Sequence, residues 1–276
     1  MNVYEKAAQW IAGADALVIT AGAGMGVDSG LPDFRGDSGF WKAYPALHGT
    51  SFASMANPQW FDSDPHRAWG FYDHRLNLYR SVTPHDGFDI LRQWSIEKNH
   101  QAFVFTSNVD GQFQKSGFSS EQMLECHGSI HHVQDLEGVD GIWAADEIVV
   151  DVDEAELKAR DPLPRHPTTQ AVIRPNILMF GDGCWNPART SAQEERYSAW
   201  LNAHQNSRIA VIEMGAGTAL PTVRRHGEYL ASRLNACLIR INPRESQVER
   251  SHISSLSIAT GAKVGLTQIN EAYRTL

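Results

Sequence analysis

Short runs of apolar residues recur along the chain, and segments with helical spacing lie between them. The runs lie at residues 16–20 (ALVIT), 102–106 (AFVFT), 177–180 (ILMF), 209–214 (IAVIEM) and 237–241 (CLIRI). Continuous apolar runs of this length are typical of strands in a sheet that is buried on both faces. Helical patterns lie at residues 3–12, 187–205, 221–235 and 265–276. The alternation predicts an α/β fold in which helices cover both faces of a parallel sheet.

Two stretches interrupt this alternation. Residues 36–84 are rich in aromatic side chains, and residues 66–80 (HRAWGFYDHRLNLYR) carry the clearest amphipathic helical pattern. Residues 141–152 (GIWAADEIVVDV) alternate in polarity, which predicts a hairpin. We therefore expect a smaller inserted lobe, made of residues 36–84 and 129–172, on a main domain made of residues 1–35, 85–128 and 173–276.

Composition narrows the classes of function. The chain has 276 residues and a formal net charge of -8, with no Lys/Arg-rich run, which argues against nucleic acid as a partner. The N-terminus predicts an amphipathic helix and not a signal peptide, and no apolar stretch approaches the roughly 18 residues of a membrane span. The cysteines, Cys126, Cys184 and Cys237, are odd in number and widely spaced. This usage predicts reduced thiols in a cytoplasmic protein without a membrane partner.

A glycine-rich turn follows the first apolar run. Gly22, Gly24 and Gly26 allow a close approach of the backbone to a pyrophosphate, although a turn without a ligand explains the glycines equally well. The spacing is a poor dehydrogenase fingerprint, because Val27 holds its last position and no acid closes a second strand about 20 residues later. Residues 29–36 (SGLPDFRG) then place an acid, an aromatic ring and a base on one loop, which favours a ligand.

Three further polar residues stand at strand ends. Asn108 and Asp110 follow the run at residues 102–106, where open α/β sheets bind their ligands, although each alone could be a loop cap. Their amide and carboxylate suit ribose hydroxyls or a carboxamide. His127 precedes Gly128 after a short apolar stretch, and a histidine taken alone is more often structural than catalytic.

Six motifs together resemble the sirtuin family. They are residues 22–36 (GAGMGVDSGLPDFRG), 106–110 (TSNVD), 126–129 (CHGS), 174–182 (RPNILMFGD), 217–220 (GTAL) and 241–242 (IN). Each motif alone is weak evidence of the family, but six motifs in the family's order over most of the chain are specific to it. The resemblance implies a Rossmann-like NAD-binding domain with a small lobe that is part helical and part degenerate zinc ribbon. It also implies an enzyme that removes acyl groups from lysine in peptide or protein substrates, with NAD as the second substrate.

The resemblance assigns roles to individual residues. In sirtuins the acyl oxygen attacks the nicotinamide ribose, nicotinamide leaves, and a histidine takes a proton from a ribose hydroxyl. The resemblance implies that His127 and Asn108 are catalytic. A histidine suits the proton transfer because its pKa lies near the working pH. The implied NAD-binding residues are Gly22, Ala23, Gly24, Asp33, Phe34, Arg35, Ser107, Asn108, Asp110, Gly217, Thr218 and Asn242. The implied peptide edge consists of Ile177, Met179, Phe180 and Gly181, on which an extended chain can pair.

The small lobe departs from the family. Sirtuins commonly hold a structural zinc with two cysteine pairs, whereas residues 128–176 contain no cysteine. Residues 164–176 resemble the zinc knuckle with His166 and Thr169 in place of its cysteines. We weigh His131, His132 and His166 as zinc ligands but expect no metal, because thiolate partners and clear ligand spacing are missing. Packing is then expected to hold the lobe, with Trp143, Ile148, Val150 and Leu157 as candidates.

Two departures concern the cofactor loops. Gly26 stands where the family usually has Ser, and Ser107 where it usually has Gln. Because Ser107 is shorter than Gln, it cannot make the same reach to the ribose. This predicts slower deacylation or a substitute residue, and leaves the prediction of NAD binding unchanged.

Tyr72 and Arg75 suggest a choice of acyl group. Their spacing puts both side chains on about the same face of a helix, where a phenol and a guanidinium can bind a carboxylate. The pair, with Phe40-Trp41 and Phe71 nearby, resembles the sirtuins that remove succinyl and malonyl groups. A half-buried Tyr and a solvated Arg on an amphipathic helix is the alternative.

Three other functions compete with deacylation. An NAD hydrolase or an ADP-ribosyltransferase would use the same transfer chemistry without docking an acylated peptide. An NAD-binding sensor would need no turnover, and the joint presence of His127, Asn108 and Asp110 argues against it. A dehydrogenase is disfavoured because no acid is placed to bind the ribose.

Overall fold

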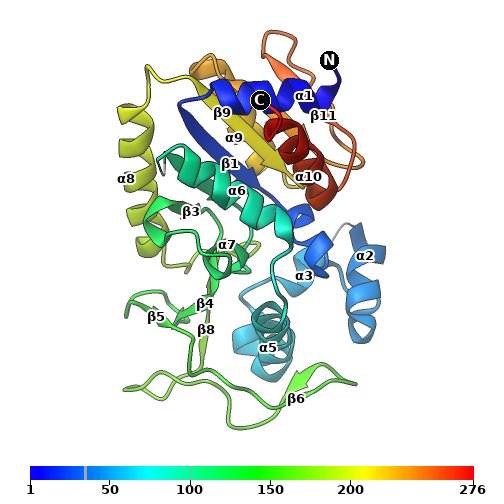
Figure 1. Ribbon diagram of the computed structural model, residues 1–276. Helices are drawn as coiled ribbons and strands as arrows, with labels where there is room; N and C mark the ends of the chain where they lie inside the picture. Colours follow the sequence, from blue (N-terminus) through cyan, green and yellow to red (C-terminus); the bar gives the residue numbers. More distant parts are fainter. Residues whose placement is uncertain (34–35, 100) are drawn as a thin grey trace.

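The computed structural model describes residues 1–33, 36–99 and 101–276. Within them a six-stranded sheet has the order β11-β10-β9-β1-β2-β3, and every pair in it is parallel (Figure 1). Its strands are β1 (Ala16–Ala21), β2 (Ala102–Thr106), β3 (Met123–Glu125), β9 (Ile209–Met214), β10 (Cys237–Ile241) and β11 (Ser255–Ile258). The predicted parallel sheet is therefore confirmed, and β3 and β11 are additions to it.

Helices cover both faces of this sheet. The helices α1 (Val3–Gly13), α6 (Asp86–Glu97) and α10 (Ala262–Tyr273) pack on one face, and α8 (Ala188–Ala203) and α9 (Thr222–Arg233) on the other. Successive residues of β1 alternate between them, since Leu17 and Ile19 join the first core and Val18 the second. Both faces are thus apolar, which explains why the strands read as continuous apolar runs.

One predicted strand is placed wrongly. The apolar run at residues 177–180 does not join the parallel sheet, because the nearby strand β8 spans Ile173–Ile177 and pairs antiparallel with β4 (Gly128–Asp135). β4 also pairs with β5 (Ile142–Ala144), which gives a separate three-stranded sheet. The segment after β8 is therefore a loop that leaves the smaller sheet toward the main domain.

The expected hairpin over residues 141–152 is also wrong. β5 pairs with β4, whereas β6 (Val152–Asp153) pairs with β7 (Lys158–Ala159). The alternating pattern belongs to parts of two different hairpins, and a period of two does not reveal which strand is the partner.

Residues 36–84 form the helical part of the molecule's lower half in Figure 1. They contain α2 (Gly36–Ala43), the 3-10 turn η3 (Pro45–Leu47), α3 (Phe52–Met55), α4 (Trp60–Ser63) and α5 (Pro65–Ser81). Short helical turns elsewhere are η1 (Ala23–Met25), η2 (Val27–Ser29), α7 (Gln112–Lys115) and η4 (Ser120–Gln122). The central helix α5 packs against β7 at Gly70, where a Cβ atom would lie 2.2 Å from the Leu157 carbonyl oxygen.

Packing holds the smaller sheet against α5, as the sequence predicted. Val150 and Leu157 are buried in a common apolar cluster with α5, and Trp143 and Ile148 pack against it. His166 accepts hydrogen bonds at Nδ1 from the Thr168 and Thr169 amides, 3.2 and 3.1 Å away. Its ring therefore supports the turn that carries it. Among residues 1–33, 36–99 and 101–276, no three His, Cys, Asp or Glu side chains gather as metal ligands.

The described part of the chain was also searched for membrane spans. None of its helices combines the length and the apolar character that crossing a bilayer needs.

Candidate functional site

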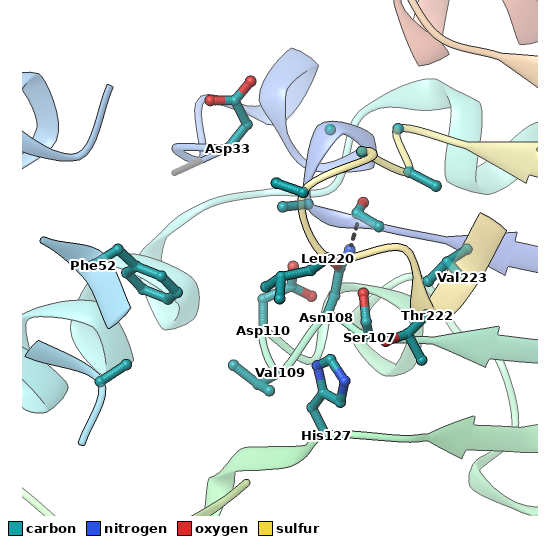
Figure 2. A pocket seen from close by; sticks show the side chains of 18 of the residues that line it. Asp33, Phe52, Ser107, Asn108, Val109, Asp110, His127, Leu220, Thr222 and Val223 are labelled. Carbon is teal, nitrogen blue, oxygen red and sulfur yellow. Dashed lines mark hydrogen bonds between the residues drawn. The ribbon is translucent and has the colours of Figure 1, made fainter. Parts of the chain in front are cut away.

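A cleft of about 510 Å³ lies at the carboxyl ends of the parallel strands. The loops after β1, β2, β3, β9 and β10 all contribute to it, and the segment after β8 and the helices α3 and α5 close the other side (Figure 2). Most of the site residues expected from the sequence line it: Gly22, Ala23, Gly24, Asp33, Tyr72, Arg75, Ser107, Asn108, Asp110, His127, Ile177, Met179, Phe180, Gly217 and Thr218. Parallel strands bring these segments to one edge because all their carboxyl ends point the same way.

The glycine-rich turn packs directly against the loop after β9. A Cβ atom on Gly24 would lie 2.7 Å from the Gly215 Cα, and one on Gly22 would lie 2.9 Å from the Ala216 Cα. The Gly24 amide also donates to the Gly215 carbonyl at 3.0 Å. Glycine is therefore required here for the contact between two loops, which together form the floor of the cleft.

The loop after β2 is tied to the same turn. The Asn108 side-chain amide donates to the Gly22 carbonyl at 3.1 Å, shown by the dashed line in Figure 2. The Thr106 hydroxyl donates to the Ala21 carbonyl and accepts from the Asn108 amide, both at 3.0 Å. Burial raises the pKa of Asp110 to about 6, and nearby Glu125 adds to the effect. The site thus holds a carboxyl group whose charge changes close to neutral pH.

His127 lies between β3 and β4 and points toward Ser107 and Asn108 in Figure 2. Its carbonyl accepts from the Leu178 amide at 3.0 Å, which ties it to the segment after β8. Gly128, with a φ of 78°, follows it, and a Cβ there would lie 2.1 Å from the Asn176 carbonyl oxygen. Burial lowers the pKa of the imidazole. His127 is therefore neutral at pH 7 and able to accept a proton.

The loops after β9 and β10 form the far end of the cleft. The Thr218 hydroxyl donates to Glu245, which also lines the cleft. Asn242 is fully buried and does not line the cleft. Its side-chain amide donates to the Ala216 carbonyl at 2.9 Å, and its side-chain oxygen accepts from the backbone amides of Arg244 and Glu245. A direct contact of Asn242 with adenosine stays a prediction, while its contacts brace both loops.

Tyr72 and Arg75 lie on α5 and line the opposite end. Arg75 is only 5% exposed and donates from Nε and Nη2 to the Tyr79 hydroxyl at 3.2 and 3.0 Å. The guanidinium lies 5.2 Å from the Phe71 ring centroid and 5.6 Å from that of Tyr72. The Tyr72 hydroxyl is buried without a hydrogen-bond partner among the described residues. A solvated Arg75 on an amphipathic helix is thereby excluded.

The segment after β8 borders this end. The Phe180 amide donates to the Ala56 carbonyl at 2.9 Å, and the Leu178 and Phe180 side chains are 38% and 37% exposed. Ile177 and Met179 are buried beneath them. Gly181 does not line the cleft, and its predicted role in a peptide edge stays a prediction.

Two predicted cofactor residues, Phe34 and Arg35, lie outside the described residues. Their neighbour Asp33 lines the cleft and forms an ion pair with Arg244 at 3.1 Å, which joins the loop after β1 to the loop after β10.

Several lining residues were missed by sequence reasoning. They include Phe52, Ala56, Tyr79 and Glu245. Glu245 follows Asn242 by three residues, and that proximity to a strand-end motif was an available signal. Phe52, Ala56 and Tyr79 belong to the helical insertion, and no motif marks them.

The cleft suits a dinucleotide. Its floor is a glycine turn that a side chain would block, its middle carries Asn108 and Asp110, and its far end carries the Thr218–Glu245 pair, which suits ribose hydroxyls.

Comparison with known proteins agrees with this geometry. The Sir2 family model matches residues 22–199. An NAD-dependent protein deacylase of Aquifex aeolicus is 24% identical over 262 residues, covering 94% of this chain and 95% of that protein. A solved Sir2 homologue–NAD complex superposes with a TM-score of 0.73 at 20% identity, covering 98% of this chain and 94% of the other.

A second relative has a different described activity. It is a probable bifunctional ADP-ribose hydrolase/ADP-ribosyltransferase of Fusarium oxysporum f. sp. cubense, 29% identical over 231 residues. The match covers 79% of this chain but 38% of that longer protein. Because the family model spans well over half of the chain and the fold and the cleft agree with it, this chain belongs to the Sir2, or sirtuin, family.

Proposed function

We propose that this chain is an NAD-dependent protein-lysine deacylase that prefers acyl groups ending in a carboxylate. The arrangement that carries the proposal is one continuous cleft with His127, Asn108 and Asp110 at its centre and the Tyr72–Arg75 pair at one end. The names of relatives such as the Aquifex aeolicus deacylase support the reaction class.

The chain's residues divide the work by position. The glycine turn and Thr218–Glu245 hold the dinucleotide, which when bound supplies an electrophilic ribose carbon and nicotinamide as leaving group. Asn108 and Asp110 orient the nicotinamide end. His127 accepts a proton from a ribose hydroxyl, for which its lowered pKa keeps the imidazole neutral at pH 7. The exposed Leu178 and Phe180 border the path by which an acyl-lysine would enter.

Charge and burial at the end of the cleft support the acyl preference. Arg75 is held by Tyr79 and by surrounding rings, and Tyr72 offers a buried hydroxyl without a partner among the described residues. Burial raises the pKa of Tyr72 to about 12, so the phenol remains a donor. A carboxylate placed between the two would receive hydrogen bonds from both side chains. One such charge-assisted bond contributes about 1.5–3 kcal/mol, on the order of tenfold to a hundredfold in rate.

The test is nicotinamide release from NAD with matched acetyl-, succinyl- and malonyl-lysine peptides. We expect succinyl-lysine to be turned over at least about tenfold better than acetyl-lysine in kcat/KM. Arg75→Met, similar in length but without donors, should erase that preference and leave acetyl removal nearly unchanged. Arg67 lies on the same helix but does not line the cleft, so Arg67→Met is the control for the loss of a positive charge.

The outcomes separate the competing functions. Equal rates on the acetyl and succinyl peptides would overturn the acyl preference but leave deacylation standing. Release of nicotinamide without any peptide would instead indicate an NAD hydrolase. Transfer of ADP-ribose to a protein would indicate the activity named for the Fusarium oxysporum relative. NAD binding with no release at all would indicate a sensor.

A further inference from the structure

A second cavity, of about 620 Å³, lies behind the wall of the cleft. Tyr79 and Asp110 are the described residues that face both. The end of α5, the start of α7, η4, β4 and α8 surround it, so side chains far apart in the sequence converge there. Asp110 in its lining belongs to a sequence motif, and His131 and His132 were weighed above only as zinc ligands. The proposed deacylation does not use the cavity.

The walls of the cavity are cationic. Arg80, Lys115, Arg189 and Arg196 line it, and among the described lining residues Asp110 is the one acid. In a chain with a net charge of -8 this is a local excess of positive charge. Like charges that face one hollow repel one another, and here two of the four, Arg189 and Arg196, pair with glutamates outside the lining.

Two of these cations are engaged by neutral groups. Arg80 donates to the Ile148 and Ala145 carbonyls at 2.9 and 2.6 Å, and Lys115 donates to the Arg80 and Val82 carbonyls at 2.6 and 2.7 Å. Carbonyl oxygens satisfy the donors and fix the side chains without cancelling the charge. The nearest acid that acts on Arg80 is Asp73, whose pKa burial raises to about 6.

The α8 side of the cavity offers donors. Arg189 pairs with the buried Glu125 through Nη2, while its Nη1 is buried without a hydrogen-bond partner among the described residues. His132 Nδ1 is also buried without a hydrogen-bond partner among the described residues. Leaving such a buried polar atom unpaired destabilises the fold, and a bound anion could satisfy it. Arg196 Nε lies 3.3 Å from a carboxylate oxygen of Glu121, and the Glu121 side chain is 72% exposed. Solvent weakens that pair, so a bound anion can compete for Arg196.

We propose that this cavity binds a small organic anion that carries phosphate or carboxylate groups, at a site separate from the cofactor cleft. Its volume exceeds that of a simple ion and suits a small molecule. Guanidinium groups recognise both phosphate and carboxylate through paired hydrogen bonds.

The two sites share a wall. His131 Nε2 lies 2.9 Å from the Asp110 carbonyl oxygen and the imidazole lines the second cavity, while Tyr79 holds Arg75 on the other side. An occupant of the cavity therefore contacts residues that also shape the nicotinamide and acyl ends of the cleft.

The test is isothermal titration of the full chain with pyrophosphate and, separately, with citrate, at low ionic strength. Saturating ADP-ribose is added to fill the cofactor cleft, so that pyrophosphate cannot bind there. We expect one site for at least one probe, which weakens as salt is added. Binding of pyrophosphate alone identifies a phosphate ligand, and binding of citrate alone a carboxylate ligand.

Variants locate the site. Arg196→Gln combined with Lys115→Gln should weaken the probe by at least about tenfold. Glu121→Gln, which removes the competitor for Arg196, should strengthen it. Arg233→Gln on α9, remote from the cavity, is the matched control and should leave affinity unchanged. Absence of any site for either probe both with and without ADP-ribose would overturn the proposal, as would equal binding by the double variant and the unmutated chain. If ADP-ribose itself does not bind, the proposed function fails while this titration still locates the cationic site.

Discussion

The buried Arg240 of the parallel-sheet domain and the buried Asp73 of the lobe around α5 have different kinds of partner. In the sheet domain Arg240 is fully buried and donates to two carboxylates, Glu213 and Glu228, so positive and negative charge lie together. On α5 Asp73 is equally buried, but its Oδ2 accepts from the neutral Asn77 amide at 2.7 Å and its Oδ1 has no hydrogen-bond partner among the described residues.

Buried polar atoms without partners among the described residues occur in both regions. In the sheet domain they include Thr20 Oγ1 on β1 and Arg189 Nη1 on α8. In the lobe the Tyr72 hydroxyl, Asp73 Oδ1 and His74 Nδ1 are buried without partners among the described residues. Such atoms lower the stability of the lobe and at one place, Tyr72, face the cleft. Under the proposed function, Tyr72 gives the lobe a part in specifying the substrate, and the strand-end loops of the sheet domain hold the cofactor.

His127 joins the two regions, because β3 of the main sheet ends just before it and β4 of the smaller sheet starts just after it. His127→Ala should lower turnover by more than about a hundredfold, since the proton acceptor is lost. NAD affinity should stay within roughly tenfold, because a general base acts on the barrier and not on the ground state. The checks are nicotinamide release and calorimetric NAD binding, with His252→Ala as control. Near-normal turnover by His127→Ala would remove its catalytic assignment.

Gly70→Ala tests how the lobe is attached. The new methyl group would lie 2.2 Å from the Leu157 carbonyl oxygen, and backbone cannot move aside as a side chain can. We expect a loss of about 1–3 kcal/mol in the free energy of unfolding, measured by urea denaturation. Gly13→Ala, near the end of α1, has nothing within 4 Å and should be neutral. Equal stability of the two variants would show that β7 does not pack on α5 as described.

Asp73→Asn tests how much the burial of the Asp73 carboxyl group lowers the free energy of unfolding. Burial raises its folded-state pKa from 3.8 to about 6, so the folded chain binds the proton more tightly than the unfolded chain. The stabilisation is complete below the unfolded pKa and is lost as pH rises through about 6. At pH 8 the Asn variant should therefore be more stable by about 1–3 kcal/mol. Thermal melts at pH 4 and pH 8 check this, and an equal melting temperature for both proteins at pH 8 contradicts it.

The smallest effect is expected from a chelator. We predict no stoichiometric zinc in the purified protein and an unchanged melting temperature with EDTA. Structural zinc supplies folding free energy directly, so its removal from a metal-dependent lobe would be visible. Elemental analysis and thermal melts provide the measurements. One tightly bound zinc per chain would show that the histidines do hold a metal.

Local patterns were enough to predict four of the six strands of the sheet, and the resemblance to the family supplied about half of the residues that line the cleft. The apolar runs at β1, β2, β9 and β10 were recognisable because a strand buried on both faces must be apolar throughout. The cofactor residues were recognisable because strand ends and glycine turns carry their chemistry in a few consecutive residues. The placement of Gly22 and Gly24 against Gly215 and Ala216 explains why the glycines stand there.

Other features depend on contacts between distant segments, which no local pattern encodes. The apolar run at residues 177–180 suited the parallel sheet, but it follows β8, which pairs with β4 in the smaller sheet. Phe52, Ala56 and Tyr79 reach the cleft only because α3 and α5 fold over it. The cationic cavity unites Arg80, Lys115 and Arg196, each of which looks like an ordinary surface charge in the sequence. The role of a charged side chain depends on its neighbours in space, and tertiary packing alone decides which neighbours those are.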